Sequence, residues 1–252
     1  MVSSIKDRLQ ILCKKMKEPI YNSYVRKRVK RLVNELEKRD IKGLDKFVQR
    51  LIDNAGDKEA YLDILMEGRF AKILSRNSFS DIQIEFADKG PDIKATWKEE
   101  TVYFEITRKR PTNEDKGIQD NAKFISPSTA NKVISKILEK IPQLQTAQLN
   151  VVVIWSDTIT LGTHELEEAF EYIRQEINDD QKKYKDLSGV LLTEGGGVNI
   201  GTFKQFYLFK NEKTSKRLET DIAKKLESLH EQDVNRLQRE WDAIYAVIRR
   251  MS

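Results

Sequence analysis

The sequence predicts an α/β fold in which a mixed β-sheet is flanked by helices, with helical extensions at both ends. Segments whose apolar residues recur at helical spacing alternate with short strand-like runs in the middle of the chain, as a layered α/β architecture requires. The first and last zones show helical spacing alone. The 252 residues therefore divide into a helical region at 1–56, an α/β core at 57–210 and a helical extension at 211–252.

The helical region at 1–56 contains two series of apolar residues three or four positions apart. Because residues at these intervals share one face of a helix, the series predict two or three helices. Gly43 and Gly56 separate the segments. The first series is Val25, Val29, Leu32, Val33 and Leu36, and the second is Leu44, Phe47, Val48, Leu51 and Ile52.

The core alternates helix and strand patterns. The continuous apolar run at 149–155 is typical of a strand that is covered on both faces. A tight turn at 98–100 joins two strands, and Pro127 and Thr163 each precede or begin a helix. The predicted elements in chain order are a helix around 62–74, strands at 82–86, 91–97 and 101–108, a helix at 128–141, a strand at 149–155, a helix from 163, and strands at 187–193 and 203–209.

The extension at 211–252 has an apolar stripe that predicts helix to the end of the chain. Such a stripe packs either on the N-terminal helices or on another subunit. Its members are Leu218, Ile222, Leu226, Leu229, Leu237, Trp241, Ile244 and Ile248.

Charge is distributed unevenly along the chain. Residues 1–50 contain fifteen Lys and Arg against six Asp and Glu, a net charge of +9, whereas the remainder has thirty against thirty-four, a net charge of −4. The densest basic run is Arg26, Lys27, Arg28, Lys30 and Arg31. We expect it to attract a polyanion through counterion release, although a solvated helix face is the simpler alternative.

Several classes of protein are not expected from the composition. No apolar run approaches the roughly 20 residues that a membrane-spanning helix needs, and the first residues lack the apolar stretch of a secretion signal. Cys13 is the only cysteine, so no disulfide can form within one chain, which favours a reducing cytoplasm. With two histidines in the sequence, a histidine-based metal cluster is not expected.

Two carboxylates in the core form the candidate site. Asp92 follows the turn at 89–91, and Glu105 lies within the apolar strand at 101–108. Alternation along that strand places Glu105 on the same face as Tyr103, Thr107 and Lys109, opposite Val102, Phe104 and Ile106. Burial of a carboxylate is costly unless it is paired, and Mg²⁺ prefers carboxylate oxygens. If the two strands pair, Asp92 and Glu105 can converge on one ion.

Pro91-Asp92 followed by Glu105-x-Thr107 resembles the PD-(D/E)xK nuclease superfamily, whose members have a restriction-endonuclease-like core. The resemblance covers roughly residues 57–210. It implies a Mg²⁺- or Mn²⁺-dependent nuclease that cleaves phosphodiester bonds, in DNA or RNA. Since the first core helix of the family often supplies another carboxylate, Glu67 is the candidate third metal ligand and Glu59 the reserve.

One position departs from the family pattern. The lysine expected two residues after the glutamate is Thr107, whose hydroxyl can hold a water but supplies no positive charge. Lys109 is the first candidate to replace it. The alternatives are Lys94 on the neighbouring strand and Lys132 or Lys136 on the following helix.

The predicted function is therefore a restriction- or repair-type endonuclease of the cytoplasm that binds nucleic acid, with DNA favoured, through its basic N-terminal region. A non-catalytic nuclease-like module that binds nucleic acid or assembles a complex is the principal alternative. The third possibility is a small α/β interaction protein in which the acidic residues of the hairpin are solvated. A homodimer stays open, because cutting both strands of a duplex commonly requires two active sites. No membrane partner is expected.

Overall fold

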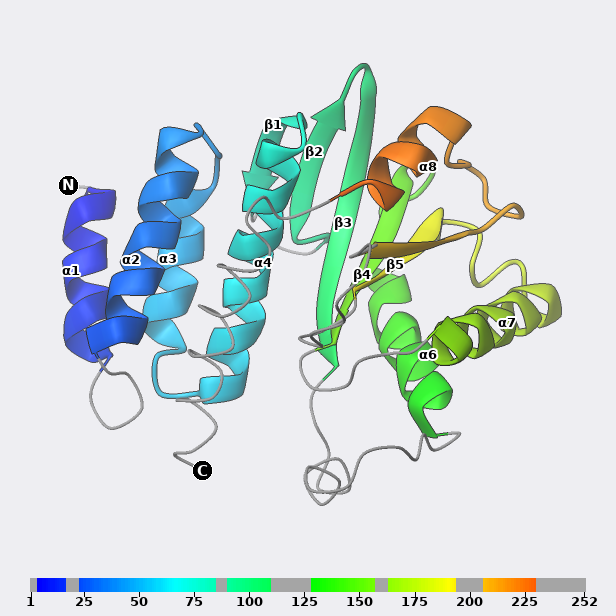
Figure 1. Ribbon diagram of the computed structural model, residues 1–252, viewed down its shortest axis with the longest axis horizontal. Coiled ribbons are helices and arrows are strands. Elements are labelled where there is room, and N and C mark those ends of the chain that lie inside the picture. The colour runs from blue at the N-terminus through cyan, green and yellow to red at the C-terminus, as the bar shows by residue number, and fades with distance from the viewer. Residues whose placement is uncertain are drawn as a thin grey trace. The chain divides into compact units, whose positions relative to one another are not determined.

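A computed structural model of the chain describes residues 4–16, 23–84, 90–109, 128–156, 163–193 and 206–229 (Figure 1). Within these ranges the fold is α/β, as the sequence predicted. Contacts divide it into two compact units. Among the described residues, the first unit comprises 4–84 and 92–100, and the second comprises 90–91 and 101–229.

The first unit, as far as it is described, combines helices with an antiparallel strand pair. Three helices lie in the described part of residues 1–56, in agreement with the two or three that were predicted. The helices are α1 (Ile5–Lys15), α2 (Ser23–Lys38), α3 (Leu44–Asp53) and α4 (Lys58–Arg76), and the strands are β1 (Ser80–Ile84) and β2 (Ile93–Trp97). Ser4 caps α1, because its hydroxyl accepts a hydrogen bond from the Asp7 amide at 3.2 Å.

The helices of the first unit pack through the apolar stripes that the sequence displays. Phe47 and Leu51 of α3 are fully buried, as is Phe70 of α4. A glycine permits the close approach of these two helices, since a Cβ at Gly68 would lie 2.5 Å from the ζ carbon of Phe47. Contacts between α4 and both β1 and β2 place this helix between its neighbours and the strand pair.

The link between α2 and α3 is tied to β1 through backbone hydrogen bonds. The Lys42 amide donates to the Ile82 carbonyl and the Ile84 amide donates to the Lys42 carbonyl, both at 3.0 Å. Gly43 follows with φ +82°, a left-handed conformation that favours glycine. A Cβ at Gly43 would lie 1.8 Å from the Ile84 carbonyl oxygen, so this junction requires glycine.

The second unit is built on a mixed sheet with strand order β3-β4-β5-β6. The first two pairings are parallel and the last is antiparallel, which confirms the predicted mixed sheet. The strands are β3 (Glu100–Lys109), β4 (Leu149–Ser156), β5 (Gly189–Thr193) and β6 (Phe206–Lys210), and the helices are α6 (Ser128–Lys140), η1 (Ile141–Gln143), α7 (Thr163–Asp179) and α8 (Thr220–Glu227).

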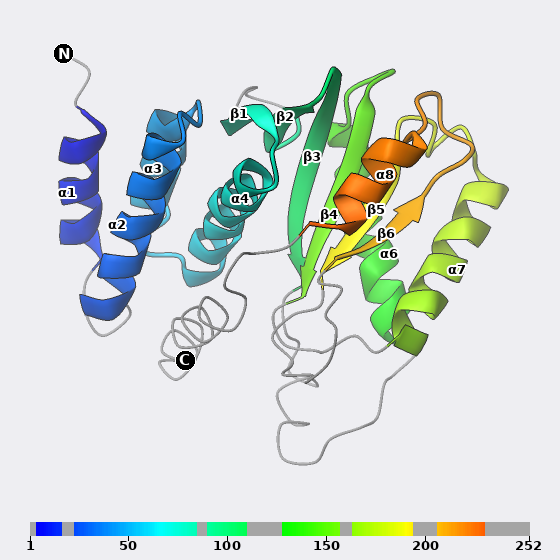
Figure 2. The same cartoon turned by 45° about the horizontal axis from the view of Figure 1, so that its top comes forward.

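Helices cover both faces of this sheet, as Figures 1 and 2 show. On one face, α6 and α7 pack on alternate residues of β4 and β5, including Val152, Ile154 and Val190. On the other face, a Cβ at Gly189 would lie 2.7 Å from a methyl group of Leu218, and α8 contacts β6. The near-continuous apolar run of β4 therefore reflects burial on both sides, as expected.

The main departure from the predicted secondary structure lies in residues 211–219, which form turns rather than helix. The side chain of Asn211 donates to the Leu187 carbonyl at 2.8 Å, and the Thr214 hydroxyl donates to the Lys185 carbonyl at 2.7 Å. These bonds to a distant turn compete with helix formation. The remainder of the predicted extension, 230–252, lies outside the described residues. Within the described helices, none is both long enough and apolar enough to cross a bilayer.

Candidate functional site

Glu105 lies on the face of β3 that is covered by α6. In the parallel register Glu105 is opposite Val152 and Thr107 is opposite Ile154. Both partners belong to the apolar cluster beneath α6 and α7, so Glu105 and Thr107 share that face. Glu105 is 0% exposed, whereas Thr107 is half-buried. The sheet therefore buries a carboxylate in the middle of an apolar strand, as the sequence predicted.

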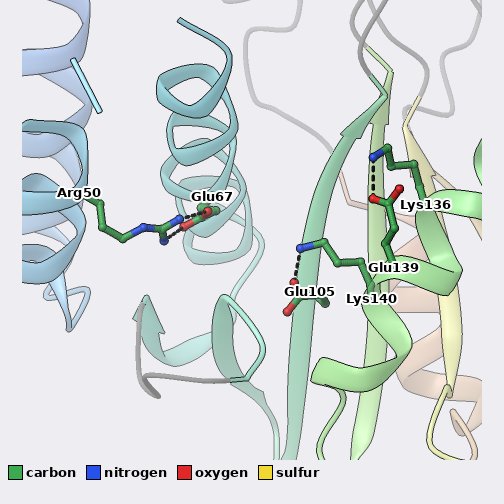
Figure 3. A network of polar contacts seen from close by, with 6 residues as sticks. All are labelled: Arg50, Glu67, Glu105, Lys136, Glu139 and Lys140. Carbon is green, nitrogen blue, oxygen red and sulfur yellow. Dashed lines mark hydrogen bonds and ion pairs between the residues drawn. The ribbon is translucent and has the colours of Figure 1, made fainter. Parts of the chain in front are cut away.

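The lysine that meets this carboxylate is Lys140, the last residue of α6. Its Nζ donates to the Glu105 Oε1 at 2.5 Å (Figure 3). A buried carboxylate without a partner costs several kcal/mol, and a charge-assisted hydrogen bond offsets part of that cost. Glu105 and Lys140 thus form a carboxylate–ammonium couple inside the second unit.

The position of Lys140 follows from the apolar stripe of α6. Val133 and Ile137 are buried against the sheet, and Lys140 continues their face at positions i, i+4 and i+7. The sequence contained this signal, because the position next in the stripe is lysine rather than an apolar residue. The sequence-based candidates on this helix were Lys132 and Lys136, one or two turns too early.

Lys136 makes a different ion pair. Its Nζ is 2.6 Å from Glu139, a residue on the solvent side of the same helix (Figure 3). The Glu139 side chain is 56% exposed, so this pair contributes little to stability. The side chains of Lys109 and Lys132 lie outside the described part of the structure. The proposal of Lys109 as the replacement lysine therefore stays a prediction, and Lys140 is the residue that sequence reasoning missed.

The other predicted metal ligands lie in the first unit. Asp92 is half-buried and directly precedes β2, and Lys94 is half-buried opposite Gln83. Glu67 is buried on α4, where both of its oxygens accept hydrogen bonds from Arg50 at 2.8 and 3.0 Å (Figure 3). This bidentate pair fixes Glu67 in an arrangement that the sequence did not indicate. The reserve candidate, Glu59, is half-buried near the start of α4.

The basic run on α2 is divided by the fold. Arg26 donates to the Met16 carbonyl at 2.9 Å, and Arg31 is 3.3 Å from Glu35. Arg28 is half-buried, whereas Lys27 and Lys30 are exposed. A polyanion would therefore meet the two lysines and the outer part of Arg31, rather than all five predicted cations equally.

Among the residues that the structure describes, no group of three or more Asp, Glu, His or Cys side chains is arranged to hold a metal ion. Asp92 and Glu67 belong to one unit and Glu105 to the other, so their convergence on one ion stays a prediction. A carboxylate such as that of Glu105 is the type of oxygen ligand that a hard cation such as Mg²⁺ prefers.

Comparison of the chain with protein-family models, with curated proteins and with solved structures finds no match.

Proposed function

We propose that this protein is a Mg²⁺- or Mn²⁺-dependent nuclease that hydrolyses phosphodiester bonds, with DNA as the favoured substrate. The observation that carries the proposal is the couple of Glu105 and Lys140. A glutamate that is 0% exposed in the middle of a strand, 2.5 Å from a lysine ammonium, supplies the two groups that the resemblance implies. The lysine comes from α6 instead of the position of Thr107.

Each residue of the couple has a distinct role. Glu105 would hold the cation, and Asp92 and Glu67 stay the other predicted ligands. When bound, the cation lowers the pKa of a water and neutralises charge that develops on the phosphate. Lys140 holds the Glu105 carboxylate in place and keeps a positive charge beside the reacting phosphate. Thr107, on the same face of β3, offers a hydroxyl that can orient the attacking water.

Plasmid cleavage in the presence of Mg²⁺, Mn²⁺ or EDTA tests this proposal. Glu105→Gln removes the charge of the ligand, and Lys140→Met removes the ammonium while it keeps a similar side-chain length. We expect each to lower the metal-dependent rate by about a hundredfold or more. Lys140→Arg retains the charge and should retain part of the activity.

Lys136→Met is the matched control, because it removes a half-buried lysine of the same helix whose partner is the exposed Glu139. It should cleave as fast as the unchanged protein. Circular dichroism and an unfolding curve show whether each variant is folded. Full activity in folded Glu105→Gln or Lys140→Met protein would remove the couple from the active site.

The alternative function, a non-catalytic nuclease-like module that binds nucleic acid, is favoured by a different observation. Both buried glutamates already have cationic partners, Glu67 with Arg50 and Glu105 with Lys140. In that case the ion pairs serve the fold alone. Absence of cleavage under every metal condition, with DNA still retarded on a gel, would decide for this module.

A further inference from the structure

Two loops of the second unit bring together basic residues that are far apart in the sequence. Residues 180–188 join α7 to β5, and residues 211–219 join β6 to α8. Six exposed cations project from these loops, and we call them the paired-loop surface: Lys182, Lys183, Lys185, Lys213, Lys216 and Arg217. The net charge of this part of the sequence gives no sign of a basic surface, because residues 51–252 have a net charge of −4.

Hydrogen bonds between the loops hold the paired-loop surface in place. The Lys185 carbonyl accepts from the Ser215 amide at 2.8 Å and from the Thr214 hydroxyl at 2.7 Å. The Ser188 hydroxyl donates to the Lys216 carbonyl at 2.7 Å. The backbone carbonyls of Lys185 and Lys216 therefore take part in the contact between the two loops, while their side chains are exposed to solvent. Because the backbone of both loops is already held by these hydrogen bonds, little backbone conformational entropy is lost when their cationic side chains bind a ligand.

The two loops together have a net charge of +2, with six cations against Asp180, Asp186, Glu212 and Glu219. Within 181–188 and 213–218, the six cations are accompanied by one acidic residue, Asp186. Its Oδ1 accepts a hydrogen bond from the Ala147 amide at 3.0 Å, so it serves a neighbouring loop. The acidic residues that flank the two segments are Asp179, Asp180, Glu212 and Glu219, of which Glu212 is 3.5 Å from Lys210.

The sheet register places this surface at the edge where the parallel strands begin. Val102 of β3 is opposite Leu149, the first residue of β4, and Gly189 begins β5 opposite Val151. Glu105 lies three residues beyond Val102, which is about 10 Å along the strand. Because β5 is two strands from β3, the lateral separation adds about 10 Å. A phosphate chain on the paired-loop surface would therefore lie within a few nucleotides of the Glu105–Lys140 couple.

We propose that the paired-loop surface binds the phosphate backbone of a nucleic acid, in addition to the basic residues of α2. Its placement near Glu105 matters only if the proposed function holds, whereas the binding itself requires no catalysis. An anionic membrane is a poorer fit, because the large hydrophobic residues exposed in the described part of the chain, Ile11 and Tyr172, are outside both loops.

The test is the salt dependence of DNA binding in EDTA, measured by fluorescence anisotropy with labelled duplex and single-stranded oligonucleotides. The variant Lys182→Gln, Lys185→Gln, Arg217→Gln removes three exposed charges. It leaves Lys183, which lies over the Tyr184 ring at 5.4 Å, and Lys213, which donates to Asn178. We expect weaker binding and a log–log slope that is shallower by up to about three units, roughly 0.9 per lost contact on duplex DNA.

A second triple variant controls for the total charge. Lys38→Gln, Lys42→Gln, Lys46→Gln removes the same charge from exposed positions of the first unit, and its slope should change by less than about one unit. Equal slopes for the two variants would overturn the proposal. A second result would also overturn it: the unchanged protein binds vesicles that contain phosphatidylserine as tightly as it binds DNA, and the paired-loop variant no longer binds these vesicles. Cleavage with Mg²⁺ is measured separately. If the paired-loop variant has an unaltered salt slope and the unchanged protein cleaves DNA, only the proposed binding surface is refuted. If the variant has a shallower slope and the unchanged protein does not cleave DNA, only the proposed nuclease activity is refuted.

Discussion

At the residue scale, the candidate site depends on one carboxylate and one ammonium group that come from different elements, Glu105 of β3 and Lys140 of α6. Glu105 interrupts an apolar alternation within ten residues, so one strand is enough to identify it. Lys140 is thirty-five positions away, and its approach depends on how α6 lies on β3 and β4. Sequence spacing records which face of a helix a residue occupies, but it does not record which turn of the helix lies opposite a given strand residue.

A second charged cluster in the first unit makes a prediction about pH. The Glu35 carboxylate lies 3.2 Å from Lys72 and 3.3 Å from both Arg76 and Arg31. Burial by itself raises the pKa of Glu35, but attraction to Lys72, a hydrogen bond from it, and the two arginines outweigh burial and lower the pKa below its ordinary value of 4.5. The charged form is thus favoured in the folded protein.

Because the pKa of Glu35 is lower in the folded protein than in the unfolded chain, its ionisation stabilises the folded state at pH values above the unfolded-state pKa. This stabilisation is lost as the pH falls through the folded-state pKa. We expect Glu35→Gln to be less stable than the unchanged protein near neutral pH, with a difference that shrinks below about pH 4.5. Urea unfolding at a series of pH values measures this. Glu139→Gln, which alters an exposed pair, is the control and should show a small difference at every pH. A Glu35 difference that stays constant down to about pH 3 would contradict the assignment.

At the element scale, the link between α2 and α3 depends on Gly43. Alanine there would have to adopt φ near +82° and would place its Cβ 1.8 Å from the Ile84 carbonyl oxygen. The left-handed conformation costs of order 1 kcal/mol and the clash forces the backbone to move, so we expect Gly43→Ala to lower the free energy of unfolding by about 3 kcal/mol or more. Thermal or urea unfolding measures the loss.

Gly56 provides the comparison for this prediction. A Cβ at Gly56 meets nothing within 4 Å. Gly56→Ala should therefore leave stability unchanged or raise it by up to about 1 kcal/mol, through the lower entropy of the unfolded chain. If the two alanine variants were equally stable, the close approach of the 41–43 segment to β1 would be wrong.

Most elements could be predicted from the sequence, because each depends on a local period. The helices α3, α4 and α6 and the strands β3 and β4 all begin within a few residues of their predicted positions. The turns at 211–219 could not be predicted in this way. Asn211 and Thr214 bind carbonyl groups more than twenty residues earlier, and apolar spacing contains no information about such partners.

At the scale of the whole molecule, the structure redistributes the charge that the sequence concentrates in its first fifth. Part of the α2 run serves the fold of the first unit, since Arg26 binds the Met16 carbonyl and Arg31 joins the Glu35 cluster. The paired-loop surface adds cations in a region whose net charge is negative. The distribution of net charge along the sequence therefore does not predict which surface a polyanion would bind.

This division predicts opposite effects for two substitutions on the same helix. Lys27→Gln with Lys30→Gln removes two exposed charges, so the log–log salt slope of DNA binding in EDTA should become shallower by up to about two units, with little change in stability. Arg26→Gln removes the donor to the Met16 carbonyl, so it should lower the free energy of unfolding by about 1–2 kcal/mol and leave the slope nearly unchanged. Anisotropy titrations and urea unfolding on the same preparations separate the two effects. A slope for Arg26→Gln as shallow as that of the double lysine variant would mean that Arg26 leaves the Met16 carbonyl to bind phosphate.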